Sequence, residues 1–216
     1  MYYQPVDDLT AFILAGGKSI RMGEDKAFLR VGDETLLSRA LNLTRSLTPN
    51  VRIVGETAKF AKLGSVIEDV YPERGPLGGI HAALLSTPTA LNLIMAIDTP
   101  FIETRFLEFL ISEARRSGAM VTVPRSGGHI HSLCAAYRKE FAAVVEQSLI
   151  LGQNRIDALF SSIKTRVIEE PELQQLGFSP EMFRNLNTPD EWEEAQIKYR
   201  SRDRRASEVT ETKRTK

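Results

Sequence analysis

Short apolar runs alternate with longer amphipathic segments along most of the chain. The apolar runs predict buried strands at Leu9–Leu14, Val51–Val54, Ser65–Glu68, Leu91–Ile97, Ala119–Val123, His131–Tyr137 and Thr165–Ile168. The amphipathic segments predict helices at Thr35–Leu47, Thr57–Leu63, Gly79–Ser86, Glu103–Ser117, Glu140–Leu151 and Arg155–Ser161. This alternation predicts an α/β fold with a doubly wound, mostly parallel sheet and helices on both faces.

Two helix ends carry clear local signals. Gly118 follows the helix over Glu103–Ser117 and is expected to end it in a left-handed conformation. A final helix is predicted to begin with a capping box, in which Thr188 is the N-cap, Pro189 the first helical residue and Glu191 the partner that reaches back.

Residues 1–197 are predicted to form a single domain, followed by a charged tail, Lys198–Lys216, that we expect to be disordered. The whole chain has 28 basic and 28 acidic residues. Eight of the basic and three of the acidic residues lie in the tail, so the body carries 20 basic and 25 acidic residues. This balance gives no reason to expect nucleic acid as a partner, and any anion site must be built locally.

The sequence favours a cytoplasmic protein without membrane attachment. Apolar runs such as Leu93–Ile97 are far too short to span a bilayer, and Asp7 and Asp8 stand where a signal peptide would be basic. The single cysteine, Cys134, cannot close a disulfide within the chain and is interpreted as a buried core thiol.

In a parallel sheet, ligands bind beyond the carboxyl ends of the strands. We therefore expect the loops after Leu14, Glu68 and Ile97 to emerge at one edge. The first of these, Leu14–Ala27, reads LAGGKSIRMGEDKA. Its glycines allow backbone amides to approach an anion, and its cations favour phosphate. An ordinary strand-to-helix turn with solvated charges is the alternative. The loop matches neither the Walker A motif nor the dinucleotide fingerprint.

The chain resembles the nucleotidyltransferase family that contains molybdenum cofactor guanylyltransferase. The resemblance is carried by four segments, which read LAGGKSIRMGEDK from Leu14, ERGPLGGI from Glu73, AIDTPF from Ala96 and NLNTP from Asn185. It implies a Rossmann-like nucleotidyltransferase fold and an enzyme that transfers GMP from Mg-GTP to the phosphate of molybdenum-molybdopterin, releasing pyrophosphate. The implied partners are GTP, the molybdopterin cofactor, and proteins that insert molybdenum or receive the cofactor.

The resemblance also assigns roles to individual residues. The catalytic residues are expected to be Arg21, Lys26 and Asp98, with the two cations stabilising the departing pyrophosphate. The nucleotide is expected to contact Leu14, Ala15, Gly16, Gly17, Lys26, Asp69, Gly79 and Asp98. Mg²⁺ is the expected cofactor, held by Asp98 and Asn187.

Each of these assignments has a structural alternative. Asp98 could cap the following helix, and Asn187 could simply precede the capped final helix. Asp69 could be a turn residue, and Arg21 and Lys26 could be solvated surface charges.

The choice of guanine is also implied by resemblance, because LAGG and GPLGG look like the guanine-using branch of the family. Gly17 and Gly79 would then leave room for a purine. A cytidylyltransferase or other nucleotidyltransferase of the same fold, and a catalytically silent GTP-binding module, remain as alternative functions. The chain also departs from the family, since it has VGET after the second strand, where an asparagine is common. The nucleotide contact of that asparagine is then either missing or supplied by Glu56 or Thr57. His129 and His131 are interpreted as residues at a strand end.

Overall fold

A computed structural model describes residues 8–16, 25–186, 188 and 190–196. Within these residues the main sheet has eight strands, in the order β10-β7-β9-β6-β1-β4-β5, with β8 paired to β7. The strands are β1 (Leu9–Leu14), β4 (Val51–Val54), β5 (Ser65–Ile67), β6 (Leu91–Ala96), β7 (Val121–Ser126), β8 (His129–Ile130), β9 (Cys134–Arg138) and β10 (Thr165–Ile168). Strands β2 (Arg30–Val31) and β3 (Glu34–Thr35) form a separate hairpin.

The sheet is mostly parallel, as predicted. Strand β1 pairs in parallel with both β6 and β4, and β4 with β5. Strand β9 runs antiparallel to β6 and to β7, so β7 and its parallel partner β10 again share the direction of β1. Consequently, the carboxyl ends of β1, β4, β5, β6, β7 and β10 lie at one edge of the sheet.

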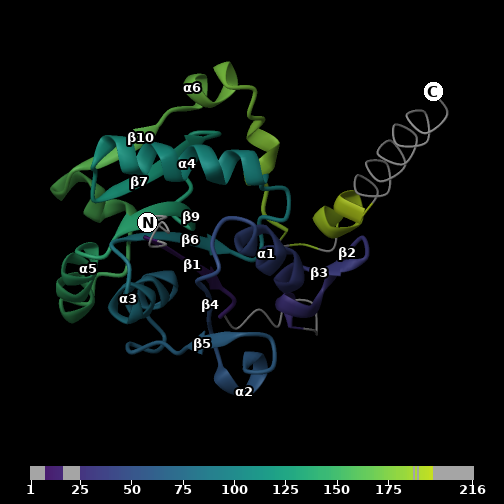
Figure 1. The fold of residues 1–216 in the computed structure, drawn as a ribbon, viewed down its shortest axis with the longest axis horizontal. Helices are drawn as coiled ribbons and strands as arrows, with labels where there is room; N and C mark the ends of the chain where they lie inside the picture. Colours follow the sequence, from purple (N-terminus) through teal and green to yellow (C-terminus); the bar gives the residue numbers. More distant parts are fainter. Residues whose placement is uncertain (1–7, 17–24, 187, 189, 197–216) are drawn as a thin grey trace, which may run out of the picture.

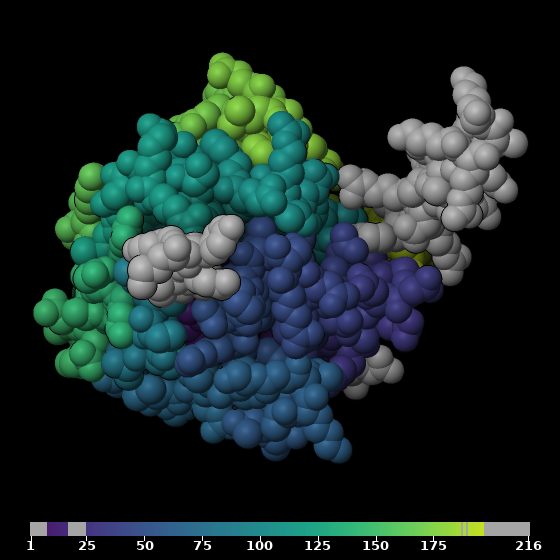
Figure 2. All heavy atoms as spheres, viewed as in Figure 1, coloured from purple at the N-terminus to yellow at the C-terminus, as the bar shows by residue number. Residues whose placement is uncertain are grey.

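Helices cover both faces of the sheet (Figure 1). Buried residues of α1 (Leu36–Arg45) and α4 (Thr104–Ser117) join one core cluster, and those of α3 (Pro76–Ser86) and α5 (Phe141–Ile150) join the other. In the space-filling view, the N-terminal part of the chain, from purple to blue, and the later part, from teal to green, occupy different sides of the molecule (Figure 2).

Several element boundaries differ from the predicted ones. Helix α3 begins at Pro76 rather than near Gly79, because Gly75 adopts a positive φ of 62° before a proline suited to the first helical position. A turn after His131 delays the start of β9 to Cys134, whose N–H donates to the His131 carbonyl oxygen (3.0 Å). Strand β7 lies two to three residues later than predicted, over Val121–Ser126 instead of Ala119–Val123.

Short elements account for the remaining differences. The helix predicted over Arg155–Ser161 is a 3-10 helix, η2 (Asp157–Ser162). The β2–β3 hairpin and α6 (Glu170–Gln175) were not predicted, and α2 (Thr57–Phe60) ends before the predicted Leu63. Two other 3-10 helices are η1 (Lys26–Phe28) and η3 (Pro180–Phe183).

The predicted helix-end signals are confirmed. Gly118 is left-handed, with φ 56°. The Glu191 N–H donates to Thr188 Oγ1 (3.3 Å) and the Thr188 N–H donates to Glu191 Oε2 (3.0 Å), which together form the capping box of the helical residues 190–196. These residues lie beside the β2–β3 hairpin, where the Gly32 N–H donates to Gln196 Oε1 (3.4 Å) (Figure 1). Pro189 and the tail Lys198–Lys216 lie outside the described residues. Among the helices that are described, none is both long enough and apolar enough to cross a membrane.

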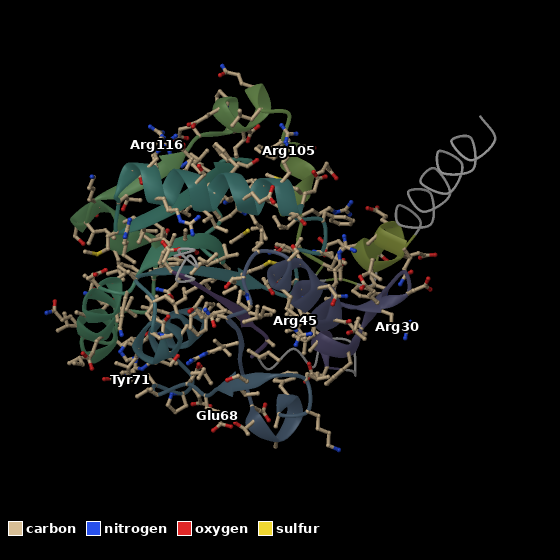
Figure 3. All side chains as sticks on the ribbon, viewed as in Figure 1. Arg30, Arg45, Glu68, Tyr71, Arg105 and Arg116 are labelled. Atoms are coloured by element: carbon tan, nitrogen blue, oxygen red, sulfur yellow. The ribbon has the colours of Figure 1, made fainter. Side chains whose placement is uncertain are left out.

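A charged network joins α4, β10 and α6 on the outside of the α4 layer. The Arg116 guanidinium donates to both carboxylate oxygens of Glu113 (2.8 and 2.7 Å), and Arg166 donates to Glu113 Oε2 and also to Glu172. The Glu113 side chain is only 10% exposed. Arg116 and Arg105 are labelled at the two ends of α4 in Figure 3. The hydrogen bond from Arg116 is the main cause that lowers the pKa of Glu113.

We predict that Glu113→Gln lowers the free energy of unfolding by about 1–2 kcal/mol at pH 7, because charged hydrogen bonds are lost from a largely buried site. The pKa of Glu113 is lower in the folded than in the unfolded state, so its contribution is present above the unfolded pKa and is lost as the pH falls through the folded pKa. The difference between variant and wild type should therefore shrink as the pH falls below the unfolded pKa of about 4.3, and it should vanish only once the pH lies below the folded pKa. Urea denaturation at several pH values measures it.

Glu108→Gln on the exposed side of the same helix is the matched control and should change stability by less than about 0.5 kcal/mol. Equal effects of the two substitutions, or a difference that does not depend on pH, would contradict the stabilising role of Glu113.

Candidate active site

The loops that follow β1, β5 and β6 meet at one edge of the sheet. Leu14 and Ala96, the last residues of β1 and β6, are paired in register. Just beyond them the Ile97 N–H donates to the Leu14 carbonyl oxygen (3.4 Å). Strand β4 pairs with β1 on the side away from β6, and β5 pairs with β4. The expectation that the loops after Leu14, Glu68 and Ile97 share an edge is confirmed.

The start of the glycine-rich loop is tied to β4. The N–H groups of Ala15 and Gly16 both donate to the Val54 carbonyl oxygen (2.9 and 3.1 Å). A Cβ on Gly16 would lie 3.8 Å from the Gly55 Cα, so the two backbones run close together. In this conformation the Gly16 amide is therefore hydrogen-bonded at the edge of the sheet. Gly17 and Arg21 lie outside the described residues.

Lys26 and Asp98 contact each other across 72 residues of sequence. Lys26 Nζ lies 3.2 Å from Asp98 Oδ2, and the two side chains are 14% and 24% exposed. Lys26 begins η1, which is capped by Asp25 Oδ1 accepting from the Ala27 N–H (3.1 Å), and Asp98 follows β6 directly. The structure thus brings a partly buried cation and carboxylate together where the first and third loops meet.

The backbone around Asp98 is held from three directions. Arg39 Nε of α1 donates to the Pro100 carbonyl oxygen (2.6 Å), and Thr99 Oγ1 donates to the Ala96 carbonyl oxygen (3.3 Å). The Leu186 N–H donates to the carbonyl oxygen of Asp98 itself (3.0 Å). Neither Arg39 nor Leu186 belongs to a sequence motif, so neither contact was predicted.

The alternative interpretation of Asp98 as a helix cap is wrong. Helix α4 begins at Thr104, and its N-cap is Glu103. The side-chain contact of Asp98 is instead with Lys26. Asp98 therefore lies beside Lys26 at the edge of the sheet and does not cap α4.

Asp69 lies against the first turn of α3. Its Oδ2 and Oδ1 atoms would be 3.5 Å from Cβ atoms placed on Gly78 and Gly79. Although the residue as a whole is exposed, the protein around its carboxyl group raises the pKa of Asp69 through desolvation. Asp69 and the N-terminus of α3 are therefore brought together at the sheet edge.

The two glycines of α3 have different surroundings from those expected. A Cβ on Gly79 would meet Leu14 Cδ2 at 3.3 Å and Val54 Cγ1 at 3.4 Å, so the protein's own side chains use the space predicted for a purine. Gly78 is tighter still, because a Cβ there would lie 2.8 Å from the Tyr71 carbonyl oxygen. Tyr71 and Glu68 lie in the loop after β5 (Figure 3). The close packing of Gly78 was not predicted, because Tyr71 belongs to a loop whose path the sequence does not specify.

Glu56 and Thr57 form local contacts at the start of α2. The Thr57 N–H donates to Glu68 Oε1 (2.8 Å), which lowers the pKa of Glu68. Glu56 accepts from Lys59 Nζ (2.7 Å), which also pairs with Asp25 (3.3 Å). Lys59 therefore links Glu56 to Asp25, which belongs to the glycine-rich loop.

Asp98 is the described residue best suited to a divalent metal. No group of three or more histidine, cysteine, aspartate or glutamate side chains that could hold a metal occurs among the described residues. A single carboxylate at an open strand end nevertheless fits Mg²⁺, which is commonly held by one or two carboxylates together with substrate phosphates. Asn187, the second expected ligand, lies outside the described residues, although its neighbour Leu186 contacts Asp98.

A separate cavity of about 540 Å³ opens at the same edge, near the end of β7 and the start of β9. It is lined by Arg125, Gly128, His129, Ile130, Ser132, Ile156 and Asp157. His129 belongs to β8 and His131 follows it, as expected for residues at a strand end. Cys134 is buried, and its burial raises the pKa of the thiol to about 12, which is consistent with a core residue and not with a nucleophile.

A family model and individual relatives place this chain in the same family. Residues 11–167 match the family model described as the MobA-like NTP transferase domain. A "Probable molybdenum cofactor guanylyltransferase" from Pelotomaculum thermopropionicum is 33% identical over 190 residues, which cover 87% of this chain and 92% of the relative. A "Molybdenum cofactor guanylyltransferase" from Desulfosudis oleivorans is 31% identical, with 88% and 96% of the two chains covered.

Solved structures show the same fold. Molybdopterin-guanine dinucleotide biosynthesis protein A from Archaeoglobus fulgidus superposes with a TM-score of 0.76 at 24% identity and covers 87% of this chain and 97% of its own. The 2-C-methyl-D-erythritol 4-phosphate cytidylyltransferase from Thermus thermophilus has a TM-score of 0.69 at 16% identity, with 89% and 99% covered.

The sheet, its strand-edge loops and the sequence matches define this protein as an enzyme of the nucleotidyltransferase class. The chain belongs to the MobA-like NTP transferase family. The resemblance found in the four sequence segments is thereby confirmed.

We predict that Gly78→Ala displaces the loop that carries Asp69 and Tyr71, because the new Cβ would lie 2.8 Å from a backbone oxygen. The expected costs are about 1–3 kcal/mol of stability and a higher KM for the nucleotide. Thermal denaturation and nucleotide titration measure these effects. Gly64→Ala is the matched control, since its Cβ would have ordinary contacts of 3.7 Å or more. Unchanged nucleotide binding in the Gly78 variant would show that this loop is not part of the nucleotide site.

Proposed function

We propose that this enzyme transfers GMP from Mg-GTP to the terminal phosphate of molybdenum-molybdopterin, forming the guanine dinucleotide cofactor and pyrophosphate. The observation that carries the proposal is the contact between Lys26 and Asp98 at the sheet edge of a MobA-like chain. The names of the relatives support the choice of guanine and of the molybdenum cofactor.

The reaction forms one P–O bond and breaks another. An oxygen of the acceptor phosphate attacks the α-phosphorus of GTP, and the bond from that phosphorus to the bridging oxygen breaks and releases pyrophosphate. The attacking phosphate is already ionised at neutral pH, so the step needs no general base. The protein contributes positioning and charge neutralisation.

The residues at the edge suit these tasks. Asp98 would hold the magnesium ion, which when bound neutralises charge on the reacting phosphates. Lys26, next to Asp98, would stabilise the pyrophosphate as it leaves, together with Arg21. Asn187 remains our candidate for a second metal contact.

The nucleotide base is assigned to the loop between β5 and α3. Asp69 lies beside the first turn of α3, where its carboxylate would accept hydrogen bonds from N1 and N2 of guanine. Leu14, Ala15, Gly16, Gly17 and Gly79 would complete the nucleotide site. Gly79 would contribute through the close packing of α3 on Leu14 and Val54 rather than through open space.

The acceptor is assigned to the cavity at the end of β7. Its lining includes a guanidinium, an imidazole and a hydroxyl, from Arg125, His129 and Ser132, which suit a polar pterin with a phosphate. The cavity lies at the same edge of the sheet as Asp98, because β7 runs parallel to β6 and β9 between them starts there. Proteins that insert molybdenum or receive the product remain proposed partners.

The base is tested by measuring pyrophosphate release with the molybdopterin acceptor and each of GTP, CTP, ATP and UTP in the presence of Mg²⁺. We expect release with GTP at least about ten-fold faster than with the others, a difference of about 1.4 kcal/mol in transition-state binding. Preference for CTP would instead establish a cytidylyltransferase, which is a real alternative because a cytidylyltransferase shares the fold. Tight GTP binding without release would indicate a silent binding module.

The role of Asp98 is tested with Asp98→Asn, which keeps the size of the side chain and removes its charge. We expect kcat to fall by roughly 10²–10³-fold while the melting temperature changes little, because the carboxylate acts on charge that develops in the reaction. Asp33→Asn, an exposed residue of the β2–β3 turn, is the control and should retain activity. Normal turnover by the Asp98 variant would remove the metal assignment.

A further inference from the structure

The segment that follows η3 contacts the backbone of Asp98 directly. The segment after η3 leads from Phe183 to Leu186, whose N–H donates to the Asp98 carbonyl oxygen (3.0 Å). Met182, Phe183 and Leu186 are all buried in the core cluster of α1 and α4. The position of the Asp98 backbone therefore depends in part on how this segment packs.

Phe183 is held by two rings from different elements. Its ring meets Phe106 of α4 edge to face, with centroids 5.2 Å apart and an interplanar angle of 88°. The Phe183 ring also stacks nearly parallel on the His131 ring, with centroids 4.2 Å apart and an interplanar angle of 12°. Stacking of this kind fixes both the position and the orientation of the ring.

His131 is in turn fixed to β7. Its N–H donates to the Pro124 carbonyl oxygen (3.0 Å), and its Nε2 lies 3.2 Å from the Ser126 carbonyl oxygen. Burial lowers the pKa of His131, so its ring is neutral at pH 7 and suited to stack on an apolar ring. The residues on either side of it, Ile130 and Ser132, line the cavity at this edge.

We propose that His131 and Phe183 are positioning residues of the active site, which fix the segment leading to Leu186 and through it the backbone of Asp98. The inference rests on the proposed function, since that function gives Asp98 its role toward the metal. A contact of this kind matters because a displacement of about 1 Å of a catalytic group can reduce the rate about 100-fold.

Phe178 provides a matched control within the same cluster. It is 5% exposed, like Phe183, and meets Phe106 edge to face at 5.5 Å and 82°. Its other ring contacts are with Phe109 and with the Arg105 guanidinium, and neither lies in the segment that reaches Asp98. Phe178→Leu and Phe183→Leu therefore remove similar packing, but only the second removes the stack on His131.

The experiment compares these two variants by hydrogen exchange at the Leu186 amide and by Mn²⁺ binding in the presence of GTP, followed by electron paramagnetic resonance. We expect Phe183→Leu to accelerate the exchange about ten-fold more than Phe178→Leu and to weaken Mn²⁺ binding about five-fold or more, while the Kd for GTP without metal stays within about two-fold. Phe183→Tyr keeps the ring and should restore Mn²⁺ binding.

Two variants of His131 test the same role even if Phe183→Leu does not fold. His131→Leu should reproduce the loss of Mn²⁺ affinity, and His131→Phe, which keeps an aromatic ring for the stack, should largely avoid it. Equal behaviour of the Phe178 and Phe183 variants, or faster Leu186 exchange with unchanged Mn²⁺ binding, would overturn the positioning role. A wild-type enzyme that releases no pyrophosphate would overturn the proposed function instead, while the exchange and Mn²⁺ comparisons still judge the positioning by themselves.

Discussion

Parallel pairing of β1 with β6 on one side and β4 on the other is the constraint on which the site depends. Because these strands run in one direction, their last residues reach the same edge, where Leu14 and Ala96 are paired in register. The loops that follow then place Lys26 3.2 Å from Asp98, although the two are far apart in sequence. A reversal of β1 would separate the glycine-rich loop from Asp98 and leave no site.

The edge has two sides that correspond to two substrates in the proposed reaction. The loops after β1 and β5 form the side assigned to the nucleotide, and the cavity near β7 and β9 forms the side assigned to the acceptor. Asp98 follows β6, which lies between them in the strand order. The segment ending at Leu186 supports this central position from the α4 face, and Arg39 of α1 supports it through Pro100. Helices of one layer thus stabilise the backbone at which the two substrates would meet.

The sequence predicted those features that depend on local signals. Buried strands such as β1, the end of α4 at Gly118 and the loops that carry the site all follow from nearby residues. It did not predict that β9 runs antiparallel, because an apolar run looks the same in either direction. It also missed Gly78, Arg39 and the stack of His131 on Phe183, since each depends on a contact between residues distant in sequence. Local signals therefore indicated which loops meet at the edge proposed as the site, whereas the contacts that support them required the three-dimensional structure.

In the proposed reaction, the carboxylate of Asp98 holds the divalent metal that accompanies the nucleotide. The most direct test is a crystal structure of the enzyme with GTP and Mn²⁺, in which anomalous scattering locates the metal. We expect a peak at about 2.0–2.3 Å from an oxygen of Asp98, the distance range of a carboxylate ligand to such an ion. A peak on the nucleotide phosphates that lies well beyond coordination distance of Asp98 would contradict it.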